Sequence, residues 1–138
     1  MKEDGRLERA WAEGRAGVNA FLDDYAFCIQ AFISLYECTF EEDWLRQAER
    51  LADYTLAHFL DAESGFFFYT SDQDPPLAAR RIELEDNVIP ASNSAMARAL
   101  FRLGHLLYRT DFTERSEALL HAMAPRLEAS IEPMFFSN

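Results

Sequence analysis

Apolar and polar residues recur along this chain with the period of α-helices, in two pairs of segments. Residues 20–39 are apolar on most of their helical surface, which is typical of an interior helix. Residues 41–60 carry an apolar seam and a polar face, as an outer helix does. The segment 93–109 has an apolar face and a wet face, and the wet face carries Arg98, Arg102, His105 and Arg109. A fourth segment from Asp111 directs Phe112, Leu119, Leu120 and Met123 inward. The pattern therefore predicts an all-α chain of helical hairpins.

The predicted hairpins cover residues 20–60 and 92–131, and the connection 61–91 joins them. We treat residues 1–138 as a single domain. The first 18 residues are polar and contain three glycines, so we expect an irregular lead-in or a short frayed helix there. Pro125 is expected to kink or end the fourth helix, because proline lacks a backbone donor and clashes with the preceding turn.

The connection between the hairpins has a different pattern. The run "GFFFYT" is an aromatic strand signal, and "DQDPP" is a turn, since its prolines deny the backbone two donors. The run "RRIEL" then provides a return strand. These three segments predict a short β-hairpin within residues 66–84.

The two hairpins also resemble each other in sequence. A shift of 72 positions places Leu35 on Leu107 and Phe40 on Phe112, so "LYECTFEE" and "LYRTDFTE" look like the same corner. Stacked hairpin repeats form either an α-solenoid or an α/α toroid. The long strand-bearing connection favours the toroid, whereas two unrelated amphipathic hairpins remain the alternative.

Composition and charge narrow the function classes. The chain has 138 residues, 49% of them apolar, which suits one globular domain. Its net charge of −11 and lack of a basic cluster argue against nucleic acid and anionic membranes as partners. There is no apolar run long enough for a membrane span, and the start lacks a signal-peptide core. With free Cys28 and Cys38, these features lead us to expect a cytoplasmic protein.

Asp23 and Asp24 are the candidate catalytic residues. Acids at the start of a helix are favoured by free N–H groups and the helix dipole, which suffices to explain Asp23 as a cap. Asp24 falls on an otherwise apolar face, where a carboxyl needs a partner or stays protonated. Protonated, it would serve as a general acid toward a sugar oxygen. The structural alternative ties Asp24 to the backbone of the 86–94 loop.

Aromatic and polar side chains near these acids are the candidate binding residues. Tyr25 and Tyr69 would stack on a sugar ring, or else pack in the core. The run "ELEDNVIPASNS" gathers polar groups next to a helix start, where Ser92 is the expected cap. That loop would bind a polyol or form a self-satisfied turn. Its candidate binding residues are Asp86, Asn87, Ser92, Asn93 and Ser94. We find no metal-ligand spacing and no cofactor motif.

Several stretches resemble the C-terminal part of the spermatogenesis-associated protein 20-like family. The sharpest markers are Phe21-Leu22-Asp23-Asp24-Tyr25-Ala26 and Pro90-Ala91-Ser92-Asn93-Ser94. The resemblance, over most of residues 4–110, implies a six-hairpin α/α barrel similar to those of N-acylglucosamine 2-epimerases and six-hairpin glycosidases. The family has glycine in the second marker ("PSGNS"), which this chain lacks. The family's thioredoxin-like domain and CxxC pair are also absent from this sequence.

Two hypotheses follow. The chain is a fragment of a carbohydrate-active barrel with little or no activity alone, which binds a sugar or polyol. Alternatively, it is a non-catalytic helical-repeat module or truncated remnant. In that case an apolar flank would drive homo-oligomerisation or association with the missing barrel segment.

Overall fold

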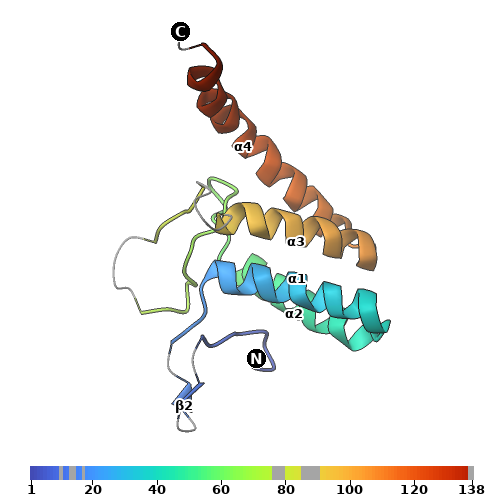
Figure 1. Ribbon diagram of the computed structural model, residues 1–138. Helices are drawn as coiled ribbons and strands as arrows, with labels where there is room; N and C mark the ends of the chain where they lie inside the picture. Colours follow the sequence, from blue (N-terminus) through green and yellow to red (C-terminus); the bar gives the residue numbers. More distant parts are fainter. Residues whose placement is uncertain (10, 13–14, 17, 76–79, 85–90, 137–138) are drawn as a thin grey trace.

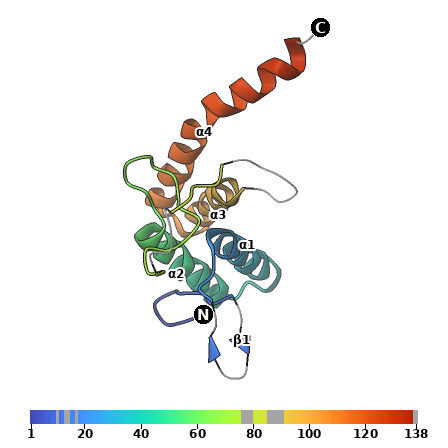
Figure 2. The same ribbon diagram turned by 90° about the vertical axis from the view of Figure 1, so that its left-hand side faces the viewer.

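Four helices account for most of the molecule (Figure 1). The computed structural model describes residues 1–9, 11–12, 15–16, 18–75, 80–84 and 91–136. Its helices are α1 (Leu22–Thr39), α2 (Glu42–His58), α3 (Ser92–Leu107) and α4 (Thr110–Phe136). The predicted all-α class is thus confirmed. Pro125 does not end the fourth helix, because α4 continues to Phe136 and extends away from the other helices (Figures 1 and 2).

The helices pack as two hairpins joined through α1 and α3. The Gln30 side chain of α1 donates to the carbonyl of Ala95 on α3 at 3.2 Å. Seven residues further along both helices, Arg102 donates to Glu37 at 2.8 Å. Since both contacts advance in the same direction, α1 and α3 run parallel to each other. Helix α2 packs on α1 and α4 packs on α3.

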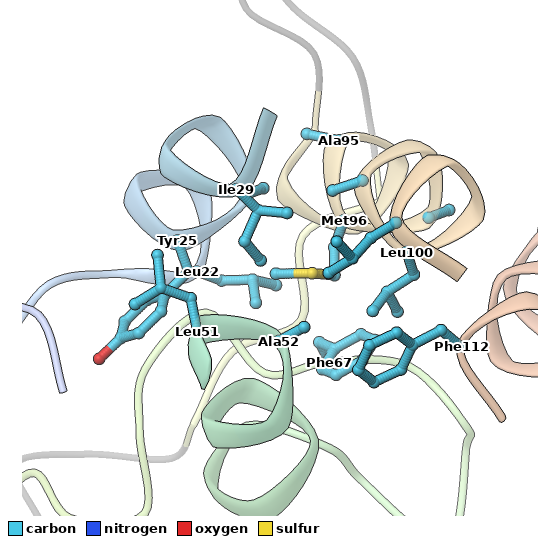
Figure 3. Packing of buried hydrophobic residues seen from close by; sticks show 14 of the residues in the cluster. Leu22, Tyr25, Ile29, Leu51, Ala52, Phe67, Ala95, Met96, Leu100 and Phe112 are labelled. Atoms are coloured by element: carbon cyan, nitrogen blue, oxygen red, sulfur yellow. The ribbon is translucent and has the colours of Figure 1, made fainter. Parts of the chain in front are cut away.

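The core lies between the four helices and is closed by the aromatic connection (Figure 3). Leu22 and Ile29 from α1 meet Met96 and Leu100 from α3, all fully buried. Burying each such side chain contributes about 1.5–3 kcal/mol. The core is completed by Phe67 of the connection and by Leu51, Ala52 and Phe112 of the outer helices.

The two corners between helices share an unusual backbone conformation. Phe40 follows α1 with φ 57°, and Tyr108 follows α3 with φ 55°. Both residues are left-handed caps whose N–H bonds the preceding turn, a position that glycine usually occupies. The structure therefore pairs Phe40 with Tyr108. The sequence shift had paired Phe40 with Phe112, which lies one turn later and inside α4.

The lead-in packs against the first hairpin. Residues β1 (Trp11–Ala12) and β2 (Arg15–Ala16) form a small antiparallel pair, where we had expected irregular chain or a frayed helix. Before it, the Leu7 N–H donates to the Tyr25 hydroxyl at 2.8 Å. Gly5 has φ 92° and lies against the Arg50 carbonyl, where a Cβ would sit only 2.6 Å away. This segment covers the flank of α1 and α2.

In the described part of the chain, the predicted β-hairpin within 66–84 is present only as a single antiparallel bridge between its two segments, and not as two regular strands. Among the described residues of the connection, pairing is limited to isolated bridges, Leu60 with Phe67 and Phe68 with Ile82. The reason is the Asn93 side chain, which accepts from Phe67 N–H at 2.8 Å and donates to its carbonyl at 2.9 Å. A side-chain amide thus takes the positions that a neighbouring strand would use.

No helix of the described residues is long and apolar enough to cross a membrane.

Candidate functional site

The start of α1 meets the aromatic connection at one end of the molecule. Six side chains gather there, which we call the loop-end cluster: Arg9, Phe21, Asp23, Asp24, Tyr69 and Arg81. The backbone holds them together, because the Leu22 N–H donates to the Tyr69 carbonyl at 3.0 Å. The cluster therefore combines two carboxylates, two guanidinium groups and two aromatic rings.

Asp24 caps α1. Its Oδ2 accepts from the Phe21 N–H at 2.9 Å, the reciprocal bond of a capping box, and lies 3.8 Å from Arg9 Nε. Its side chain is 29% exposed, so it is not the deeply buried acid that its helical position predicted. We had given the cap to Asp23, whereas Asp24 accepts the bond from the backbone at the start of α1.

Asp23 is bound to the aromatic connection. Its Oδ2 accepts from the Tyr69 hydroxyl at 3.3 Å, and its Oδ1 accepts from the Asp24 N–H at 2.8 Å. Burial, with the nearby Asp23 charge, raises the pKa of Tyr69 to about 12. Tyr69 thus stays protonated at neutral pH and donates to Asp23.

The aromatic pair forms the apolar part of the cluster. The rings of Phe21 and Tyr69 stack with centroids 4.8 Å apart. Arg9 lies 5.0 Å from the Phe21 centroid, and Arg81 lies 5.5 Å from that of Tyr69. Arg81 also pairs with Glu83 at 2.9 Å. Carboxylates that accept hydroxyl hydrogens beside a partly exposed ring make a surface suited to a polyol.

Some predicted binding residues are instead part of the packing. Tyr25 is buried, stacks on Tyr54 at 5.6 Å, and accepts from Leu7, and burial raises its pKa above its usual range. Asn93 is fully buried, and besides Phe67 it donates to the Glu83 carbonyl at 2.8 Å. Both side chains serve the fold.

The remaining candidates lie at the start of α3 and before it. Ser92 is the first helical residue and not the cap, which is Ala91. Its hydroxyl is buried with no hydrogen-bond partner among the residues that the structure describes. Ser94 is half-buried, with Oγ 3.9 Å from the Met123 sulfur. Asp86 and Asn87 lie outside the described residues.

Arg9 was missed by the sequence analysis. It belongs to the segment classed as an irregular lead-in, and no periodic pattern marks it as a neighbour of α1. Among the described residues, Arg81 contacts Tyr69 and Glu83. Within the described part of the chain, no group of His, Cys, Asp and Glu is arranged to hold a metal ion.

Comparison with known proteins relates this chain to part of a longer protein. No family model matches the chain. Spermatogenesis-associated protein 20 of Rattus norvegicus is 32% identical over 132 residues, which is 89% of this chain and 17% of that protein. The Homo sapiens protein is 31% identical over the same share. The chain is distantly homologous to one part of spermatogenesis-associated protein 20.

A further relative extends this similarity beyond mammals. An uncharacterized protein of Caenorhabditis elegans is 29% identical over 115 residues, covering 83% of this chain and 16% of that protein. The resemblance drawn from the two sequence markers is thus confirmed as a relationship to spermatogenesis-associated protein 20. The chain spans about a sixth of the length of these relatives.

Proposed function

We propose that the chain supplies two successive hairpins of an α/α toroid similar to those of N-acylglucosamine 2-epimerases and six-hairpin glycosidases. The observation that carries this proposal is the parallel pair α1 and α3, each with its own outer helix. In a toroid the inner helices run parallel around a lumen. The same pairing in this chain supports α1 and α3 as inner helices.

The loop-end cluster is then part of the mouth of the ring, where it binds a sugar or polyol. The stacked Phe21 and Tyr69 offer an apolar face, and Asp23 keeps lone pairs for substrate hydroxyls beyond its bond from Tyr69. Acid–base catalysis needs a second group across the substrate. The described residues place both acids on the same turn of α1, so we propose binding by this chain without turnover.

Sugar binding is tested by saturation-transfer NMR with N-acetylglucosamine and glucose. We expect signal transfer to ligand protons for the wild-type chain and about tenfold weaker binding for Asp23→Asn. Glu117→Gln is the charge-matched control, since Glu117 is exposed on α4, and it should bind as wild type does. Equal signals in all three proteins, or none in the wild type, would overturn the sugar-binding proposal.

A second candidate function is a non-catalytic repeat module that associates with itself. It is favoured by large apolar side chains on the inner helices: Phe27, Leu35 and Phe101 are 40%, 40% and 45% exposed. Light scattering on a size-exclusion column distinguishes the two candidates. A molar mass that rises with protein concentration and does not change when sugar is added supports the repeat module. A monomer at all concentrations contradicts it.

A further inference from the structure

The two corners of the hairpins lie at the same end of the molecule. Because α1 and α3 run parallel, the turns that follow them come out side by side, on the right in Figure 1. We call this region the corner end, and define it by residues 37–46 and 101–114. It is opposite the loop-end cluster, so its properties are independent of the sugar site proposed above.

Each corner presents an aromatic side chain to solvent. Phe40 is 77% exposed and Tyr108 is 93% exposed, and both have positive φ. Glycine is favoured in that conformation because a Cβ crowds the backbone. Phe40 retains an edge contact with Tyr36 at 6.2 Å, but the exposure of Tyr108 means that packing within this chain does not account for it. Two equivalent positions thus hold exposed rings where folding favours glycine.

Charge at the corner end determines which partner fits. Its six exposed acids are Glu37, Glu41, Glu42, Asp43, Asp111 and Glu114. Its three arginines are each paired already: Arg46 with Glu42 and Asp43, Arg102 with Glu37, and Arg109 with Asp111. The surface is therefore aromatic with an excess of negative charge.

We propose that the corner end docks a cationic segment of a partner protein. Arginine or lysine side chains of that segment would lie over the Phe40 and Tyr108 rings and pair with the surrounding carboxylates. A second copy of this chain is disfavoured as the occupant, because two acidic corner ends would repel each other. The Phe40 and Tyr108 rings supply most of the binding energy, and the surrounding acids favour a partner segment with positive charge.

The test uses a fluorescent peptide of alternating arginine and leucine, with binding followed by anisotropy and by amide NMR shifts. The key variant is the double substitution Phe40→Gly and Tyr108→Gly. Glycine suits the left-handed backbone, so this variant should be at least as stable as wild type. We expect its affinity to fall by about tenfold while all charges are kept. Phe27→Ala, which removes an exposed ring on α1 outside the corner end, should bind normally.

The outcomes are distinct. Shifts confined to residues 37–46 and 101–114, lost in the double glycine variant, support the proposal. Equal affinity of the double variant, or shifts spread over the whole acidic surface, would mean non-specific charge attraction and would overturn it. A dimer in the wild type that dissociates in the glycine variant would identify a second copy as the occupant and would also overturn it. Asp23→Asn should leave peptide binding unchanged, so failure of the sugar-binding proposal can be distinguished from failure of the peptide-docking proposal.

Discussion

Arg109 lies at the corner between α3 and α4, yet its Nη2 donates to the Asp53 carboxylate of α2 at 3.0 Å. The same guanidinium reaches Glu49 at 2.8 Å and Asp111 at 2.6 Å, and lies 4.0 Å from the Phe112 ring centroid. Its side chain is 31% exposed, and the three carboxylates raise its pKa above the usual range. Arg109 thus connects the second hairpin to the outer helix of the first.

Replacing Arg109 with alanine should destabilise the fold by about 1–2 kcal/mol, because charge-assisted hydrogen bonds to three acids are lost. Arg109→Lys should recover less than half, since an ammonium lacks the planar fork that reaches several carboxylates. Urea denaturation measures both variants. Arg98→Ala, an exposed position on α3, is the control and should stay within about 0.5 kcal/mol of wild type. Equal stability of Arg109→Ala and Arg98→Ala would show that the hairpins are held by packing alone.

Protonation of Asp111 should weaken this connection in acid. The hydrogen bond from Arg109 lowers the pKa of Asp111 below its ordinary 3.8. A group with a lowered folded pKa adds stability above its unfolded pKa, and this stability is lost as pH falls through the folded value. Asp111→Asn should therefore be less stable than wild type at pH 7, and the difference should shrink below pH 3.8. The pH dependence of thermal melting measures this, and a difference that is constant with pH would contradict it.

Asn93→Ala should be one of the most damaging single substitutions in the chain. It removes three hydrogen bonds from a fully buried side chain and leaves the N–H and carbonyl of Phe67 unpaired. Buried polar groups without partners cost about 1–3 kcal/mol each. Hydrogen exchange should show faster exchange of the Phe67 amide. Ser94→Ala, the adjacent control, should leave that amide protected. Unchanged protection in Asn93→Ala would contradict the role of the Asn93 side chain in holding the Phe67 backbone.

Gly104 fixes how closely α3 and α4 approach. An added Cβ would lie 2.7 Å from Thr113 Cγ2 and 3.0 Å from the Arg109 carbonyl. Gly104→Ala should therefore cost about 1–3 kcal/mol despite the better helix propensity of alanine. Thr113→Ser, which removes the clashing methyl, should restore part of the loss in the double variant. The melting temperatures of the four proteins in this cycle measure the coupling, and additive effects would contradict the contact.

Much of this architecture was predictable because it rests on periodicity. The periodicity of residues 20–39 and of residues 41–60 correctly predicted that helices α1 and α2 form there. Corners and connections were less predictable, since they depend on contacts between distant residues. The Asn93 side chain replaced a strand partner for Phe67, and no local pattern indicates that.

The candidate site was found in outline but not in detail. Asp23, Asp24 and Tyr69 do come together, as expected for a loop end of the inner helix. Which acid caps α1 depends on the exact first residue of the helix, and sequence patterns do not resolve that. The partners of Arg109 on α2 were not predictable, because Glu49 and Asp53 are far away from it in sequence.

The central claim is that α1 and α3 are parallel inner helices of successive hairpins. A nitroxide on Cys38, exposed near the end of α1, tests it in the Cys28→Ser background. Because Glu37 lies beside Arg102 in the parallel arrangement, the label is about 10 Å nearer, along the helix axis, to the last turn of α3 than to its first. We predict strong broadening of amide signals for 101–107 and weaker broadening for 92–95. Strong broadening of 92–95 instead would contradict the parallel pair, and with it the toroid.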